Sequence, residues 1–278
     1  MKCRLCEGGT RLRVVRTDLS LDRCLSCGFV SGWPTSSLAV QEYYQGYHAA
    51  PPPPAPETRY HQWLAEAEAR LGRGRRLLEV GAGSGGFVRV ARARGWQVDA
   101  TEVSASGLAR LGETGATVFG GDLLEAGYPE AVFDLVVSLE VIEHLPSPTP
   151  HLRELARVTR SGGLLLLTTP NFRGLSGRLL GVRWRVVTPE HLGYFTARTL
   201  ERSLRRAGYR RLQIASRSLD VTTWRRCREE PAQFNPQAAA QLRDSVEGSR
   251  ALRWSKTLIN LALRATGLGD TLLAWAER

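Results

Sequence analysis

One stretch, at residues 77–94, constrains the fold more than any other. The apolar run Leu77–Val80 contains Glu79 and leads into the glycines Gly81, Gly83 and Gly85. From Phe87 onwards, apolar residues recur at helical spacing. A strand, a tight turn and a helix in this order let backbone amides approach a ligand closely. Glycines at positions 81, 83 and 86 also satisfy G-x-G-x-x-G, so the stretch alone leaves open which adenosine-containing cofactor is bound.

Strand-like and helix-like patterns alternate along the next hundred residues. This alternation predicts an α/β fold, a Rossmann-like doubly wound sheet with helices on both faces. The expected helices lie at 58–71, 87–94, 105–115 and 149–159, and the expected strands at 77–80, 96–101, 116–120, 133–138 and 164–171. Asp99 lies inside a strand pattern, and we expect its side chain to face outward.

Length and composition are typical of a soluble globular protein. The chain has 278 residues, of which 42% are hydrophobic, enough for one large domain with a small appendage. It has no apolar run of the about 18–20 residues that span a bilayer. Cysteines and charges occupy the N-terminus where a signal peptide would be apolar. We therefore expect a cytoplasmic protein.

The net charge of +11 invites a nucleic-acid interpretation. Only Lys2 and Lys256 are lysines, however, and the arginines are scattered along predicted helices. Arginines scattered in this way indicate a bias in amino-acid composition and not a surface that binds nucleic acid, so nucleic acid is not the expected partner.

Two C-x-x-C pairs lie near the N-terminus: Cys3 with Cys6, and Cys24 with Cys27. Two such turns facing each other form a tetrahedral sulfur site suited to zinc, and residues 1–35 resemble a zinc ribbon. Disulfides, or redox chemistry at one pair, are the alternatives. Cys227 is left over as a plain thiol.

Residues 36–57 differ in composition from the flanking regions. Tyr43 and Tyr44 lie in an aromatic, polar stretch, and a proline run at 51–54 predicts a semi-rigid connector. The tyrosines either fold over a ligand or pack the N-terminal segment onto the main domain, which we place at 58–278.

Five ordered motifs resemble those of class I S-adenosylmethionine-dependent methyltransferases. They are Glu79-x-Gly81-x-Gly83-x-Gly85, then Glu102, then Gly121-Asp122, then the run 133–144, and finally the run 162–171. A dehydrogenase would share only the first two. The resemblance implies a seven-stranded sheet whose last strand is antiparallel.

The resemblance also assigns roles in binding S-adenosylmethionine. Gly81, Gly83 and Gly85 would let the backbone meet its methionine part, and Glu79 would lie near its ammonium group. Glu102 would accept from both ribose hydroxyls. Asp122 and Leu123 would flank the adenine, and the backbone at Leu139 would line the channel to the sulfonium.

Residues 188–196 resemble the segment that covers the substrate in this superfamily, followed by strands at 211–216 and 269–275. This leaves about 220–268 as a helical insertion before the last strand. A substrate cap, a homodimer surface and a peripheral membrane contact are its alternative roles.

Two histidines are candidates for a catalytic base. His144 follows the fourth strand at the carboxyl edge of the sheet, and His191 lies in the covering segment. Glu140 and Tyr194 are candidate substrate contacts, together with Tyr43 and Tyr44. The remaining histidines, His48, His61 and His151, are expected at the surface or in linkers. The sequence suggests no metal site beyond the cysteines.

The favoured function is methylation of a small molecule at oxygen or carbon. A sugar, a glycolipid, a quinone-like ring or a secondary metabolite would be the acceptor. An RNA methyltransferase and a non-catalytic zinc-ribbon adaptor are the alternatives.

Overall fold

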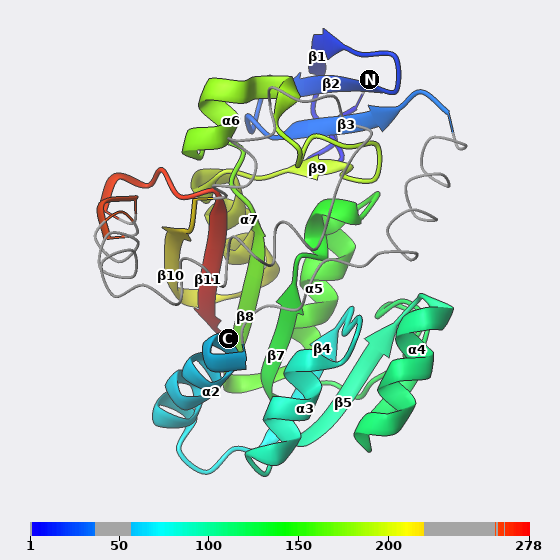
Figure 1. Cartoon of the computed structure of the whole chain (residues 1–278), viewed down its shortest axis with the longest axis vertical. Coiled ribbons are helices and arrows are strands. Elements are labelled where there is room, and N and C mark those ends of the chain that lie inside the picture. Colours follow the sequence, from blue (N-terminus) through cyan, green and yellow to red (C-terminus); the bar gives the residue numbers. More distant parts are fainter. Residues whose placement is uncertain (1, 37–56, 220–258, 260, 264) are drawn as a thin grey trace, which may run out of the picture.

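The computed structural model describes residues 2–36, 57–219, 259, 261–263 and 265–278. These residues form two sheets, a seven-stranded one and a smaller four-stranded one at one end of the molecule (Figure 1). The expected connector and most of the expected helical insertion, including Tyr43, Tyr44, His48 and Cys227, lie outside the described residues.

The large sheet has the order β10-β11-β8-β7-β4-β5-β6. Its strands are β4 (Arg76–Val80), β5 (Gln97–Glu102), β6 (Thr117–Gly120), β7 (Phe133–Leu139), β8 (Thr159–Pro170), β10 (Arg210–Arg217) and β11 (Thr271–Glu277). Five neighbouring strands, β8, β7, β4, β5 and β6, are parallel to one another, and β11 is antiparallel to both β8 and β10. The predicted doubly wound sheet with an antiparallel last strand is confirmed.

Two layers of helices bury the two faces of this sheet. The helices are α2 (Glu57–Leu71), α3 (Gly86–Ala93), α4 (Ala105–Leu111), α5 (Pro148–Val158), α6 (Leu175–Leu180) and α7 (Ala197–Ala207), with 3-10 turns η1 (Gly112–Thr114), η2 (Ile142–His144) and η3 (Gly181–Arg183). Apolar residues of α2 and α3 share one core cluster with β4 and β7, whereas those of α5 and α7 share another. Central strands such as β8 are therefore buried on both faces, which explains their continuous apolar sequence.

The small sheet joins the N-terminus to the main domain. Its strands β1 (Thr10–Val15), β2 (Leu19–Cys24) and β3 (Val30–Pro34) are antiparallel, and its fourth strand is β9 (Gly193–Tyr194). The backbones of β3 and of the residues before β9 lie close together, because a Cβ on Gly32 would lie 2.5 Å from the backbone oxygen of His191. The covering segment is thus part of the N-terminal sheet.

Two sequence expectations about single side chains are wrong. Asp99 is 7% exposed, lies 3.9 Å from Nε of Arg76, and has a raised pKa because burial disfavours its charge. His151 lies on the buried side of α5 and is 1% exposed. Both errors arise because neighbours distant in sequence cover these positions. In the part of the chain that the structure describes, no helix has the length and apolar character to cross a membrane.

Candidate functional site

The glycine turn lies between the end of β4 and the start of α3. Gly81, Gly83 and Gly85 all have positive φ, at 69°, 54° and 72°, a conformation that side chains with a Cβ disfavour. The amides of Gly81 and Ala82 donate to the carbonyl of Thr101, at 2.9 and 3.0 Å, which ties the turn to the end of β5. A Cβ on Gly81 would lie 2.6 Å from Cγ2 of Val141, whereas one on Gly83 would meet nothing within 4 Å. The backbone at Gly83 therefore borders open space.

Glu102 is the last residue of β5, and its carboxylate anchors two amides. Oε2 accepts from the Gly83 amide at 2.7 Å, and Oε1 accepts from the Ser104 amide at 2.8 Å. A carboxylate has about four acceptor positions, so two oxygens that each hold one amide can still accept from hydroxyls. The glycine turn and the Glu102 carboxylate thus form one preorganised site that can accept hydrogen bonds from a ligand.

Glu79 in β4 is buried beside the same turn. It is 4% exposed, and its Oε2 has no hydrogen-bond partner among the described residues. Burial, with a smaller contribution from the charge of Glu102, raises its pKa from 4.5 to about 8. A buried acid with a free oxygen is suited to an ammonium group, which would supply the missing partner.

The remaining expected cofactor residues lie at the ends of β6 and β7. Asp122 follows β6, and its Oδ1 accepts from the Leu124 amide at 2.8 Å. Leu123 is buried in the core, and Leu139, the last residue of β7, packs against the cluster that contains the glycine-turn residue Ala82. These residues therefore stand along one edge of the sheet, at the carboxyl ends of its parallel strands, where ligands bind in such folds.

The structure brings the two candidate histidines together. The rings of His144 and His191 are perpendicular, with centroids 4.6 Å apart. Burial lowers the pKa of His144 to about 4 and that of His191 to about 3, the second helped by the neighbouring His144. Both rings are therefore neutral at neutral pH. Glu143 lies beside them, 1% exposed, and burial raises its pKa well above the usual range.

The candidate substrate residues take different positions. Glu140 directly follows β7 with a φ of 56°, a conformation that is rare outside glycine, and its carboxylate interacts with that of Glu143. Tyr194 is 2% exposed within the small apolar core beside the N-terminal sheet, and its hydroxyl donates to the carbonyl of Thr188 at 3.2 Å.

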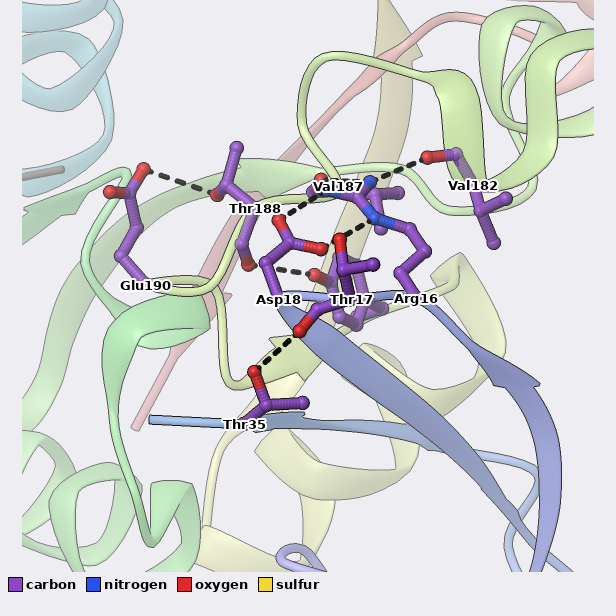
Figure 2. A network of polar contacts seen from close by, with 9 residues as sticks. Arg16, Thr17, Asp18, Thr35, Val182, Val187, Thr188 and Glu190 are labelled. Atoms are coloured by element: carbon purple, nitrogen blue, oxygen red, sulfur yellow. Dashed lines mark hydrogen bonds and ion pairs between the residues drawn. The ribbon is translucent and has the colours of Figure 1, made fainter. Parts of the chain in front are cut away.

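The turn after β1 holds the backbone that leads into the covering segment (Figure 2). Arg16 pairs with Asp18 through both carboxylate oxygens, and its Nη1 donates to the carbonyls of Val182 and Val187, at 2.8 and 3.0 Å. A second contact lies near His144, where Nη1 of Arg4 donates to the carbonyl of Pro146 at 3.2 Å. Arg4 and Arg16, which flank β1, therefore hold the backbone shortly after His144 and shortly before His191.

The four N-terminal cysteines form a compact cluster. Their sulfurs lie within 4.8 Å of one another, and two pairs are closer: Cys3 with Cys27 at 3.7 Å and Cys6 with Cys24 at 3.5 Å. These distances exceed a disulfide bond of about 2.05 Å. A zinc tetrahedron with bonds of about 2.3 Å has edges of about 3.8 Å, so the spacing suits tetrathiolate zinc.

Comparison with known proteins establishes the family. A family model described as a methyltransferase domain matches residues 55–214, more than half of the chain. This chain belongs to that methyltransferase family. The matched region contains the glycine turn, Glu102, and both histidines.

Curated relatives match over part of their length. Ajmaline N-methyltransferase of Rauvolfia serpentina is 35% identical over 111 residues, which are 37% of this chain and 38% of that protein. A probable S-adenosylmethionine-dependent methyltransferase of Mycobacterium tuberculosis is 34% identical over 115 residues, 41% of this chain and 42% of that protein. The ubiquinone biosynthesis O-methyltransferase of a Caulobacter strain is 34% identical over 110 residues, 35% of this chain and 42% of that protein. The chain thus spans about two fifths of the length of these relatives.

Solved structures share the fold. A methyltransferase from Archaeoglobus fulgidus aligns with a TM-score of 0.56 at 17% identity, covering 85% of this chain and 99% of that one. One from Thermotoga maritima aligns with a TM-score of 0.52 at 16% identity, covering 86% and 95%.

Sequence reasoning missed one grouping of functional side chains. Glu143, His144 and His191 place one potential ligand atom each within 4.8 Å of one another, although the sequence suggested no metal site beyond the cysteines. Adjacent Glu143 and His144 after a strand were a visible signal. No signal in the sequence indicated that His191 joins them, because 46 residues (145–190) separate it from the pair.

Proposed function

We propose that this chain transfers the methyl group of S-adenosylmethionine to a small molecule. The observation that carries the proposal is the Glu102 carboxylate, held by the Gly83 and Ser104 amides beside an open glycine turn. A sulfonium activates its methyl group for transfer because the neutral thioether is a good leaving group, and the protein supplies alignment.

Each part of the cofactor has residues that fit it. The glycine turn formed by Gly81, Gly83 and Gly85, which borders open space at Gly83, would accept the methionine part, and the free Oε2 of Glu79 would face its ammonium. Glu102 would accept from the ribose hydroxyls. The segment at Asp122 and Leu123 would border the adenine, and the backbone at Leu139 would border the sulfonium.

The acceptor would lie near His144 and His191, beyond the end of β7. Tyr43, Tyr44, Glu140 and Tyr194 remain proposed contacts on this side. Relatives named for ajmaline, ubiquinone biosynthesis and 27-O-demethylrifamycin SV favour a small-molecule acceptor over nucleic acid.

Structural zinc would stabilise the N-terminal sheet. We propose that Cys3, Cys6, Cys24 and Cys27 bind one zinc ion, because their sulfur spacing fits a tetrahedron and none of them forms a disulfide. Since β3 pairs with β9, this zinc would also keep the covering segment over the acceptor side.

Calorimetric titration of the full chain with S-adenosylmethionine tests the cofactor site. Glu102→Gln replaces one anchoring oxygen with an amide nitrogen and removes the charge. A hydrogen bond to a charged group contributes about 1.5–3 kcal/mol, so we expect affinity to fall by roughly 10- to 100-fold.

The matched control is Glu113→Gln, an exposed acid on η1 that should bind like the wild type. Thermal unfolding of each variant confirms that it is folded. An unmodified chain without affinity for S-adenosylmethionine would overturn the proposal, and so would equal affinities of the two variants.

A further inference from the structure

Three potential metal ligands meet where β7 ends and the covering segment passes over it. Glu143 and His144 belong to η2, and His191 precedes β9. One ligand atom from each lies within 4.8 Å of the others. The backbone reinforces this meeting, because the Leu192 amide donates to the carbonyl of Glu143 at 2.7 Å.

Two of these side chains have buried polar atoms without partners. Glu143 is 1% exposed, and its Oε2 accepts from the Thr169 hydroxyl at 2.9 Å, but its Oε1 has no partner among the described residues. Nδ1 of His144 is likewise buried and, within the same residues, unpartnered. A buried polar atom without a partner is costly, and a bound cation would satisfy both atoms.

The third side chain is oriented as metal-binding histidines usually are. Nδ1 of His191 lies 2.7 Å from the carbonyl of Val186. A carbonyl can only accept, so Nδ1 carries the proton and Nε2 keeps its lone pair. Such a bond from the far ring nitrogen fixes the tautomer of histidine ligands.

Further oxygens surround the three ligands. The carboxylate of Glu140 interacts with that of Glu143, and a cation or a shared proton would relieve the repulsion between the two groups. Oε1 of Glu190 lies 3.8 Å from Nε2 of His191, too far for a hydrogen bond.

We propose that Glu143, His144 and His191 bind a divalent transition-metal cation, distinct from the zinc of the four cysteines. Two imidazoles and one carboxylate form a set that binds Zn²⁺, Mn²⁺ or Fe²⁺ and leaves positions open for another ligand. The histidines then act as ligands and not as general bases.

This inference rests on the proposed methyl transfer and adds to it a role for a bound cation. The metal site lies next to the glycine turn, since Val141 directly precedes η2 and its Cγ2 lies 2.6 Å from the position that a Cβ on Gly81 would take. A hydroxyl bound to the cation would have a lowered pKa and release its proton to water. Its oxygen would form the new bond to the methyl carbon as the carbon–sulfur bond breaks towards sulfur. The inferred acceptor atom is therefore an oxygen.

Titration of the full chain with Mn²⁺, followed by the electron paramagnetic resonance of free Mn²⁺, tests the site directly. We expect one saturable Mn²⁺ per chain in the presence of the cysteine-bound zinc. Glu143→Gln keeps the shape of the side chain, and we expect it to weaken Mn²⁺ binding at least about 100-fold. Thr169→Val, which removes only the hydrogen bond to Glu143, should weaken binding about 10- to 100-fold.

His61→Ala is the matched control, since His61 is an exposed histidine on α2. It should bind Mn²⁺ like the wild type. No saturable binding in the wild type, or equal binding in Glu143→Gln and His61→Ala, would overturn the inference.

Titration of the same samples with S-adenosylmethionine separates the two proposals. Cofactor binding without Mn²⁺ binding would overturn the metal site alone, and a shared proton between Glu140 and Glu143 would then explain their contact. Failure to bind the cofactor would count against the methyltransferase proposal, whatever the Mn²⁺ result.

Discussion

Substituting Gly81 by alanine should destabilise the protein in two separable ways. At a φ of 69°, a Cβ strains the backbone by about 1–2 kcal/mol. The same Cβ would lie 2.6 Å from Cγ2 of Val141, so the segment leading to η2 must shift. Overpacking of this kind costs about 1–3 kcal/mol. We therefore expect Gly81→Ala to lower the free energy of unfolding by about 2–5 kcal/mol.

Gly83→Ala separates the two effects. Gly83 has a similar φ of 54°, but a Cβ there would meet nothing within 4 Å, so only the backbone strain remains. The expected loss is about 1–2 kcal/mol. Urea denaturation of both variants measures the difference, which is the contribution of the contact with Val141.

A double-mutant cycle checks that assignment. Val141→Ala removes the methyl group that the new Cβ would meet, so Gly81→Ala should cost about 1–3 kcal/mol less in the Val141→Ala background. The corresponding cycle with Gly83→Ala should show no coupling. Equal losses for the two glycine variants, or a cycle without coupling at Gly81, would refute the reasoning.

Two further predictions concern buried groups. Because the folded protein keeps the proton of Glu79 up to about pH 8 whereas the unfolded chain releases it near 4.5, the stability of the ligand-free protein should fall as pH rises through this window. Glu79→Gln should flatten that part of the denaturation profile, and a variant as pH-sensitive as the wild type would contradict the assignment. Metal analysis of the purified wild-type chain should find about one zinc ion, which Cys24→Ser should lose together with a lower melting temperature. A folded, zinc-free wild type would exclude structural zinc.

The sequence predicted those features that depend on neighbours along the chain. Glycines between an apolar strand and an amphipathic helix indicated the turn at 81–85, and the long apolar run at 164–167 indicated a strand buried on both faces. The spacing of the cysteine pairs likewise indicated two turns able to face one another. In each case the physical requirement, backbone freedom or side-chain periodicity, acts over a few consecutive residues.

Side-chain surroundings were harder to predict. Asp99 occupies a strand position that alternation assigned to solvent, yet it is 7% exposed beside Arg76. His151 was expected at the surface and is buried. Sequence periodicity describes one element, whereas burial depends on what packs against that element.

What the sequence alone determined, then, is the family fold, and it predicted the glycine turn and Glu102 as the candidate cofactor site. Only the tertiary structure decided that β9 joins the N-terminal sheet, and that His191 meets Glu143 and His144. The physical reason is that these contacts close long loops. Their formation depends on the packing and hydrogen bonding of whole elements, including the bonds from Arg16 to the carbonyls of Val182 and Val187, and no local pattern encodes it.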